Sequence, residues 1–410
     1  MKMKTLTTVI MISLGVSGVL SKSVLAADNE LLVWEDIKKS DGVADAIKAF
    51  EQQNNVKIKV LETPYAQQIE KLRLDGPAGI GPDVIVIPND QVGTAVVQGL
   101  VSELKLTPSF QSIFTKPSLE ALTYNGKLYG VPKAVETTVL VYNKDLLPTP
   151  PEKFDDLFTF SKQQRAEGRY GLLAKFDEIY YSYGVIAGMG GYIFGQNGDG
   201  SANVNDIGLD KPVTIDAVNY IKKFYTDGLF PPGIIGDSGA NAIDSLFTEK
   251  KAAAVITGPW AFQPYKNAGI NYGVAPWPLL PNGEHPRSLL GVKGYSISTY
   301  SKNKALAQKF IEFINQPDYA KTRFKLTGEI PPIAALINDP LIKDDEKARA
   351  VAIQASYAVP MPSVPEMQEV WTPANSALQL SVTGKQDTKA ALESAVKNIK
   401  MQIEASHSNQ

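Results

Sequence analysis

Few side chains in this 410-residue sequence have the types and spacing that catalysis requires. The chain contains two histidines, His285 and His407, and neither lies in an HExxH zinc motif. Residues 236–239 read Gly-Asp-Ser-Gly, as around a serine nucleophile, but His285 would have to act as base without any supporting context. We interpret this segment as a glycine-rich turn. The absence of cysteine excludes disulfides, thiolate nucleophiles and cysteine-ligated metals.

Oxygen-bearing side chains alternate between residues 197 and 205 in the manner of a calcium-binding loop. Ala202 stands where the sharp turn needs glycine, and Gly208 stands where a bidentate glutamate should follow, so we expect a polar loop without metal. Carboxylate pairs for glycoside hydrolysis are available among 43 acidic residues, but no spacing selects one. A glycoside hydrolase therefore stays open as an alternative function, and no cofactor is expected. The alternating side chains are Asn197, Asp199, Ser201, Asn203 and Asn205.

Charge is evenly balanced along the chain. There are 41 Lys and Arg against 43 Asp and Glu, and the basic residues are scattered rather than clustered. Because binding to phosphate backbones needs concentrated positive charge, we expect no nucleic-acid partner.

The N-terminus has the pattern of a secretory signal peptide. Lys2 and Lys4 precede an apolar or small-residue run over residues 6–20, which is too short to span a bilayer. We expect export with cleavage after Ala26 or Ala27. Since no lipobox cysteine could tether the mature chain, the sequence favours a periplasmic location.

Hydrophobic periodicity predicts the elements that must position any site. Residues 31–34, 56–61 and 83–87 are typical of buried strands, and a helical pattern covers residues 43–50. Strands alternating with helices predict a parallel sheet covered by helices, and the chain length favours two lobes. Residues 124–127, Tyr-Asn-Gly-Lys, predict a tight hairpin. Later in the chain we expect helices over 217–225, 243–247, 305–314 and around 392–403, and a strand over 252–257.

Several motifs, in order and spacing, resemble the maltose/maltodextrin-binding proteins of bacterial ABC importers across essentially the whole mature chain. The strongest is Ala-Val-Glu at residues 134–136, followed by Leu-Val-Tyr-Asn-Lys-Asp-Leu-Leu-Pro at 140–148. Others are Leu-Val-Trp at 32–34, Gly-Pro-Asp at 81–83, Gly-Gly-Tyr at 190–192, Gly-Pro-Trp-Ala at 258–261, Gly-Val-Lys-Gly at 291–294 and the Met-Pro segment from 361 to 365.

The resemblance implies an α/β fold of the periplasmic-binding-protein type, with two α/β lobes joined by a three-crossover hinge and a ligand cleft between them. After the signal peptide (1–26), the N-terminal lobe would comprise 27–134 and 295–340, the C-terminal lobe 135–294 and 341–410, and the hinge would lie near 134–137, 291–294 and 340–346.

The resemblance also implies a sugar site. Aromatic rings cover the apolar face of a sugar, while carboxylates and amides bind its hydroxyls. The expected stacking aromatics are Trp260, Trp371 and Tyr180, with Tyr181 and Met361 beside them. The expected acids are Glu136, Glu178 and Asp90, and a looser match near the first strand adds Glu35, Asp36 and Lys38. For these residues the alternatives are core packing and surface solvation. Trp34 is expected in the core, and Trp277 at the rim or in the core.

One departure from the resemblance bears on the ligand. The enterobacterial maltose-binding protein carries a Trp after the Pro-Asp strand where this chain has Ile87, and an Arg shortly afterwards is replaced by Gln91. The loss of a ring and a cation should weaken or widen that subsite. We therefore expect a monomeric, non-catalytic protein that delivers α-1,4-gluco-oligosaccharides to ABC permease subunits, with cyclodextrins or another oligosaccharide as the alternative ligand.

Overall fold

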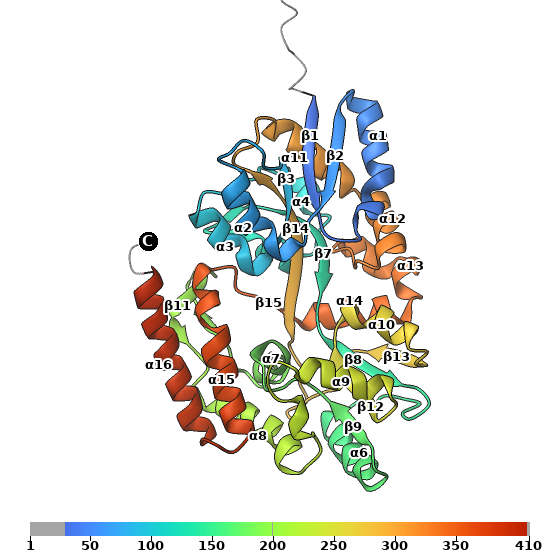
Figure 1. Ribbon diagram of the computed structural model, residues 1–410, viewed down its shortest axis with the longest axis vertical. Coiled ribbons are helices and arrows are strands. Elements are labelled where there is room, and N and C mark those ends of the chain that lie inside the picture. The colour runs from blue at the N-terminus through green and yellow to red at the C-terminus, as the bar shows by residue number, and fades with distance from the viewer. Residues whose placement is uncertain (1–28, 199, 408–410) are drawn as a thin grey trace, which may run out of the picture.

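The computed structural model describes residues 29–198 and 200–407. The expected signal peptide and Asp199 of the expected polar loop lie outside these residues. The described chain folds into two α/β lobes, one above the other in Figure 1, with strands passing between them. The predicted two-lobed α/β fold is confirmed.

The upper lobe is built on a sheet whose centre confirms the predicted strand–helix–strand order. Strands β1 (Glu30–Glu35), β2 (Lys57–Glu62) and β3 (Val84–Pro88) run parallel in the spatial order β3–β1–β2. Helices α1 (Ala44–Asn54) and α2 (Tyr65–Asp75) provide the crossovers that parallel pairing requires. The β-branched strand β3 is buried along its whole length, as expected for a strand inside a helix-covered sheet.

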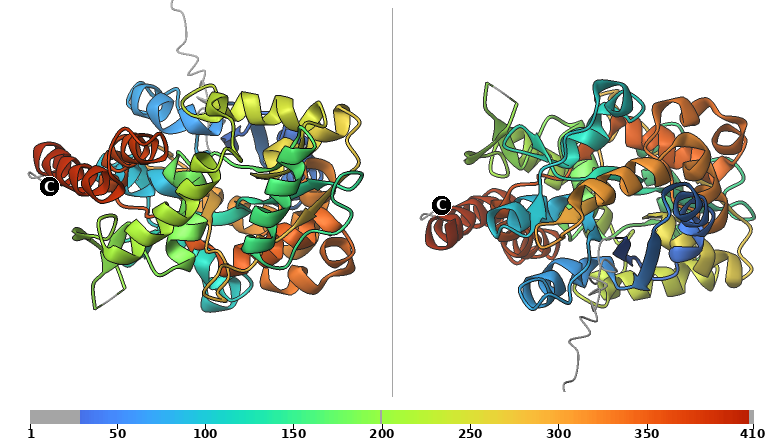
Figure 2. Two further views of the ribbon diagram at one scale, coloured as in Figure 1. Left: turned by 90° about the horizontal axis from the view of Figure 1, so that it is seen from below. Right: turned by 90° about the horizontal axis from the view of Figure 1, so that it is seen from above.

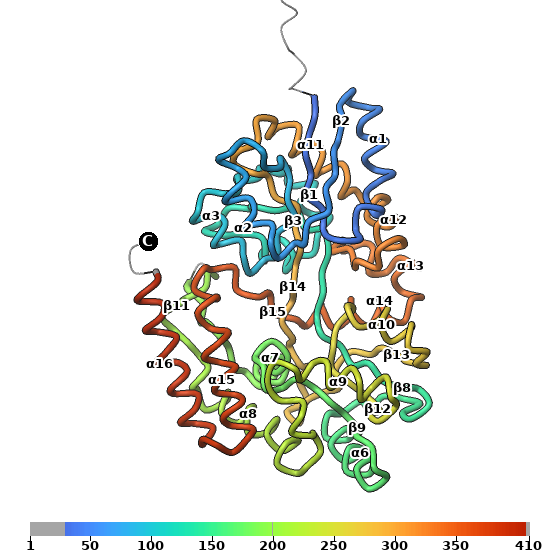
Figure 3. Tube along the Cα trace, viewed as in Figure 1, coloured from blue at the N-terminus to red at the C-terminus, as the bar shows by residue number. Residues whose placement is uncertain are grey.

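One long strand, β14 (Leu289–Ser298), connects the two lobes. It pairs antiparallel with β3, with β4 (Val101–Ser102) and with β7 (Val131–Glu136), and parallel with β15 (Val359–Pro360). Figure 3 shows β14 and the chain that follows β7 running from the upper into the lower lobe. The pairing of β7 with β14 therefore brings two crossings of the chain together.

The lower lobe contains a second sheet in the order β13–β8–β12–β9. Only residues 137 and 138 separate the end of β7 from the start of β8, although the two strands belong to different sheets. The strands are β8 (Val139–Asn143), β9 (Tyr170–Leu173), β12 (Ala252–Thr257) and β13 (Tyr272–Ala275). The chain thus passes from one lobe to the other within a few residues.

Helices cover both sheets. In the upper lobe α11 packs on α1, and the rings of Phe50 and Phe310 meet edge to face with centroids 5.3 Å apart. Figure 2 shows α15 and α16 together at one side of the molecule. Besides α1 and α2, the upper lobe contains α3 (Val92–Val97), α4 (Pro108–Gln111), α5 (Lys116–Ala121), α11 (Lys304–Ile314) and α12 (Pro317–Thr327). Helix α13 (Pro340–Lys343) comes after α12 in the chain. The remaining helices are α6 (Phe154–Ala166), α7 (Ile179–Gly188), α8 (Pro212–Thr226), α9 (Gly239–Thr248), α10 (Phe262–Asn267), α14 (Glu346–Tyr357), α15 (Trp371–Val382) and α16 (Thr388–His407).

Two local predictions about turns are confirmed. Asn125 and Gly126 both have left-handed φ values, 48° and 73°, and join β5 (Thr123–Tyr124) to β6 (Lys127–Leu128) as a two-residue hairpin requires. Gly236 also has a positive φ of 85°, in the turn just before α9, so residues 236–239 form a glycine-containing turn.

The predicted polar loop is wrong in its second half. Residues Ala202–Ile207 form strand β11, which pairs with β10 (Phe194–Gln196). The burial of this segment does not alternate, so its pairing with β10, rather than a period-two pattern, makes it a strand despite its polar composition.

Two tryptophans belong to the core. Trp34 and Trp277 are each 2% exposed, which confirms the first assignment and decides the second. The indole Nε1 of Trp277 donates to the carbonyl of Thr138 at 2.9 Å, as a buried tryptophan requires. Among the described residues, none of the helices combines the length and apolarity needed to cross a membrane.

Candidate functional site

A cleft of about 390 Å³ lies where the crossing strands meet both lobes. Such a volume is in the range of ligand sites in proteins. The upper lobe contributes the start of α2 and the segment after β3, the crossing strands contribute β7 and β14, and the lower lobe contributes α7, the turn after β12 and the start of α15. The lining consists of Tyr65, Ala66, Pro88, Asn89, Asp90, Gln91, Glu136, Tyr180, Trp260, Gly291, Val292, Lys293, Met361 and Trp371.

A second cavity, of about 220 Å³, lies behind the crossing strands and has different chemistry. It is lined mainly by apolar residues such as Leu290, Ile330 and Ile337, and no charged side chain lines it. The larger cleft has charged side chains as well as aromatic rings in its lining, and convergent polar groups in a partly apolar pocket are typical of ligand sites. We therefore take the larger cleft as the candidate site.

Aromatic rings form the lower-lobe side of the cleft. Trp260 is 44% exposed, and its ring centroid lies 6.2 Å from that of Tyr180. Gly258 permits this orientation, because a Cβ at that position would lie 2.2 Å from the Trp260 ring. Trp371 begins α15, and Met361 follows β15. The rings offer flat apolar surfaces to a bound molecule, and the thioether of Met361 adds a flexible apolar one.

Charged groups gather on the crossing strands. Lys293, on β14, is 14% exposed, and its Nζ lies 3.8 Å from Glu136 Oε2 and 3.6 Å from Asp36 Oδ2. The same ammonium lies 4.0 Å from the centre of the Tyr65 ring. Burial alone would lower the pKa of Lys293, but Glu136, Tyr65 and Asp36 outweigh it and raise that pKa above its usual value. The ammonium is therefore held in its charged form.

Burial in the cleft also raises the pKa values of three acidic groups. Burial raises the pKa of the Asp90 carboxyl, and it raises that of the Tyr180 hydroxyl well above its ordinary value, with Glu136 adding to the second effect. Burial likewise raises the pKa of Tyr65, although Lys293 partly opposes this. The tyrosine hydroxyls thus stay protonated and can both donate and accept hydrogen bonds.

Buried Asn89 joins the two sides of this site. Its Nδ2 donates to the carbonyl of Met361 at 2.9 Å, and its Oδ1 accepts from Val292 N at 3.0 Å. The amide therefore ties the segment after β3 to β14 and to the chain leading into α15.

The structure brings six of the eleven predicted site residues to the lining of the cleft. These are Asp90, Glu136, Tyr180, Trp260, Met361 and Trp371. The other five do not line it. Lys38 is exposed with a left-handed φ of 60°, whereas Asp36 lies behind Lys293 and the side chain of Glu35 is fully buried.

Glu178 and Tyr181 lie beside the cleft on the lower lobe. Glu178 precedes α7, and its Oε1 lies 3.2 Å from the Nζ of buried Lys175. Burial raises the pKa of Tyr181 to about 12, with Glu178 adding to the shift, and its ring packs edge to face on Tyr180. Tyr181 thus supports the ring of Tyr180, while Glu178 is held by Lys175.

Sequence reasoning missed four polar lining residues. Lys293 stands inside the Gly-Val-Lys-Gly motif assigned to the hinge, and that motif could have indicated a cleft residue. For Gln91 the resemblance indicates only the loss of an Arg and not a ligand contact. Tyr65 and Asn89 carried no signal, because nothing in a single sequence shows that the start of α2 and the end of β3 meet β14.

The arrangement suits recognition rather than bond breaking. Rings on one side and carboxylate, amide, hydroxyl and ammonium groups on the other match a molecule with apolar faces and many hydroxyls. Across the described residues 29–198 and 200–407, no group of three or more His, Asp or Glu side chains is arranged to hold a metal ion.

Comparison with known proteins gives consistent matches. Residues 45–350 match a family model described as bacterial extracellular solute-binding protein. The galactooligosaccharide-binding protein of Bacillus subtilis is 50% identical over 93% of this chain and 91% of its own length. The maltodextrin-binding protein of the same organism is 38% identical, with 93% of each chain covered. The crystal structure of a cyclo/maltodextrin-binding protein complexed with maltotetraose matches with a TM-score of 0.87 and 38% identity, covering 92% of this chain and 98% of the other.

Proposed function

The chain belongs to the bacterial extracellular solute-binding proteins, and from that premise we propose that it captures a neutral oligosaccharide for an ABC importer. The observation that carries the proposal is the cleft itself, in which exposed Trp260 faces a set of hydrogen-bonding groups on the crossing strands. Sugar hydroxyls can replace water on these groups while the rings cover the apolar faces.

The charges of the lining favour a neutral sugar. Glu136 in the lining and Asp36 behind Lys293 set two carboxylates against the single ammonium of the lining, and Asp90 adds a third carboxyl group. An anionic sugar would bring its own carboxylates next to these groups, and like charges held together in a partly buried site repel strongly. Uronic-acid oligosaccharides are therefore expected to bind poorly.

Two neutral ligand classes have specific support. The motif resemblance favours α-1,4-gluco-oligosaccharides, including cyclodextrins. The 50% identity to a galactooligosaccharide-binding protein, against 38% to a maltodextrin-binding protein, favours galacto-oligosaccharides, which we place first. Ile87 carries no ring, is fully buried within β3 and does not line the cleft, so this position offers no stacking surface to a sugar, and this departure also speaks against maltose.

Titration calorimetry with a panel of sugars tests the proposal. The panel comprises galactobiose, galactotriose, maltose, maltotriose, maltoheptaose, a cyclodextrin and trigalacturonate. We expect saturable binding of at least one neutral oligosaccharide and none of trigalacturonate. If trigalacturonate bound more tightly than every neutral sugar, the charge argument would be wrong.

We further propose that the protein is non-catalytic. The family and its relatives bind solutes, and the cleft groups are arranged around a cation rather than as a separated acid and nucleophile. Overnight incubation with the tightest-binding oligosaccharide, followed by chromatography, should return the sugar intact. Release of shorter sugars would support the glycoside hydrolase alternative.

Membership in an extracellular family supports export, and we propose a monomer that works in the periplasm and docks on the permease subunits of its importer. Residues 1–26 would be removed as a signal peptide, so the exported protein should begin at Ala27 or Asp28 by mass spectrometry. We also propose that the lobes comprise 27–134 with 295–340 and 135–294 with 341–410. The pairing of Glu136 with Gly291, at the point where β7 ends, supports a hinge at the first two crossings.

A further inference from the structure

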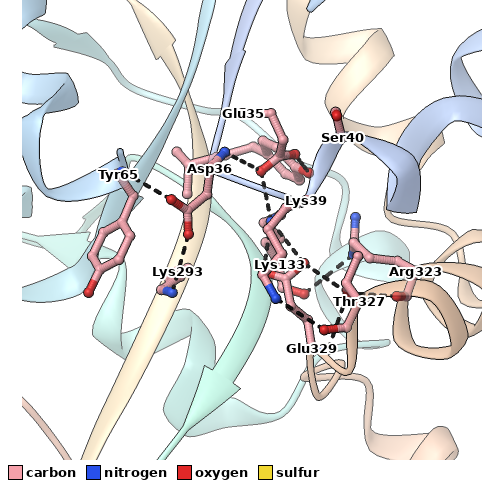
Figure 4. A network of polar contacts seen from close by, with 12 residues as sticks. Glu35, Asp36, Lys39, Ser40, Tyr65, Lys133, Lys293, Arg323, Thr327 and Glu329 are labelled. Atoms are coloured by element: carbon pink, nitrogen blue, oxygen red, sulfur yellow. Dashed lines mark hydrogen bonds and ion pairs between the residues drawn. The ribbon is translucent and has the colours of Figure 1, made fainter. Parts of the chain in front are cut away.

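Glu35, at the end of β1, is a buried carboxylate next to the cleft that cannot touch a ligand. Its side chain is fully buried and does not belong to the lining. Its Oε1 lies 2.8 Å from Lys133 Nζ and accepts the backbone N–H of Asp36 at 2.7 Å (Figure 4). Its Oε2 accepts the hydroxyl of Tyr295. All the partners of this carboxylate thus belong to the protein.

The cluster around Glu35 balances its own charge. Lys133 is fully buried and also binds Glu329, at 2.8 and 3.0 Å, and buried Arg323 bonds to the carbonyl of Lys133. Lys133 pairs with both carboxylates, and Arg323 adds a second positive charge that acts on Glu329. Because removing one partner of a buried ion pair leaves an uncompensated charge, each of these groups is held firmly in place.

Glu35 is the first member of a chain of contacts that ends in the cleft. By accepting the N–H of Asp36, it fixes the backbone of that residue. The Asp36 carboxylate in turn accepts the N–H of Ile37 at 2.8 Å and that of Tyr65 at 3.2 Å, and its other oxygen faces Lys293. Figure 4 shows Asp36 between Tyr65 and Lys293, both of which line the cleft.

The same chain of contacts connects strands that are distant in the sequence. Lys133 lies on β7 and Tyr295 on β14, and these strands pair directly, with Ala134 opposite Lys293. Glu35 therefore joins β1 to the two crossing strands that carry the charged groups of the cleft. A free Asp36 loop would have several conformations, and ordering it upon binding would cost conformational free energy.

We propose that Glu35 is a positioning residue of the binding cleft, acting through Asp36 on Tyr65 and Lys293 and never on the ligand itself. The ligand-binding part of this idea rests on the proposed function, but the positioning part does not. Sequence reasoning placed Glu35 among the ligand contacts. The structure assigns it an indirect role instead.

The positioning is tested first without sugar, by amide hydrogen exchange. Glu35→Met removes both acceptor oxygens at similar size, and Glu329→Met is its matched control, because it removes the other carboxylate on Lys133 without touching Asp36. In Glu35→Met the amides of Asp36, Ile37 and Tyr65 should exchange at least tenfold faster than in Glu329→Met. Equal protection of these amides in both variants would overturn the proposal.

Affinity is then measured by calorimetry with galactotriose and with maltotetraose. Glu35→Met should weaken binding about tenfold or more, Glu329→Met less than about threefold, and Glu35→Gln should restore most of the affinity because its amide oxygen still accepts the Asp36 N–H. Equal losses in the two Met variants, or no loss in Glu35→Met despite faster exchange, would reduce Glu35 to a stability role. If neither sugar binds the unmodified protein, the proposed function fails while the exchange result stands.

A milder variant keeps the test valid if Glu35→Met does not fold. Tyr295→Phe removes only the hydroxyl that holds Glu35 Oε2. It should speed exchange at Asp36 and weaken affinity in the same direction by a smaller factor. Unchanged exchange at Asp36 in this variant would contradict the proposed chain of contacts.

Discussion

Replacing Trp260 with Ala should weaken sugar binding strongly while leaving the fold nearly as stable. The ring is 44% exposed, stands on a short turn after β12 and lines the cleft. A tryptophan side chain carries about 250 Å² of surface, so this fraction leaves about 110 Å² open to a ligand. Covering half to all of that area at ~25 cal/mol/Å² stabilises the complex by ~1.3–2.8 kcal/mol, or about 10- to 100-fold in Kd.

The matched control is Trp277→Phe, in the same lobe. Trp277 is 2% exposed, and its Nε1 is the donor to the Thr138 carbonyl. Phe keeps most of the packing but leaves that buried carbonyl unpaired, which costs about 1–3 kcal/mol of stability. We expect this variant to lose thermal stability and to keep its affinity at temperatures where it is folded.

The assay combines calorimetric titration, with the tightest-binding sugar of the panel, and thermal unfolding without sugar. Trp260→Ala should change the titration, and Trp277→Phe should change the melting temperature. The reasoning would be refuted if Trp260→Ala lost several kcal/mol of stability with an unchanged Kd, because the ring would then be part of the core.

Three further outcomes are expected. Glu136→Gln should weaken sugar binding more than Glu178→Gln in the same titration, because only Glu136 lines the cleft and faces Lys293; a larger loss at Glu178 would restore it as the main ligand acid. Asp90→Asn should stabilise the sugar-free protein in urea unfolding at neutral pH, because burial raises the pKa of Asp90 and its ionisation above that pKa costs folding free energy. The stability difference between the two proteins should vanish at about pH 3, where the carboxyl is protonated in both the folded and the unfolded state. A gain in stability that persists at that pH would exclude ionisation as the cause. Saturating sugar should reduce the radius of gyration in solution scattering, because a ligand that contacts both lobes favours a closed population, and an unchanged radius would contradict hinge closure.

Local rules in the sequence were sufficient for most elements of the fold. The β-branched run at residues 83–87 gave β3, and the Asn-Gly pair at 125–126 gave the hairpin, because burial and left-handed φ are properties of these residues themselves. The polar composition of residues 202–207 misled the prediction, since pairing with β10 stabilises a strand there.

The aromatic part of the site was also within reach of the sequence. Gly258 and Pro259 precede Trp260 in the pattern of the resembling family, and that context indicated a ring available to a ligand. The motif order was enough to distinguish Trp260 from Trp34, which lies near the end of the apolar strand β1 and is buried.

What the sequence by itself determined was thus the type of each element and the chemistry available to the cleft. Which carboxylate faces the cleft and which is buried was decided only by the tertiary structure. Glu35 and Asp36 are neighbours in the chain, yet one is held by Lys133, 98 positions later, and the other by Lys293, 257 positions later. The physical reason is that a charged group takes its role from the partners and the solvent around it, and the crossing strands bring those partners together only in the folded protein.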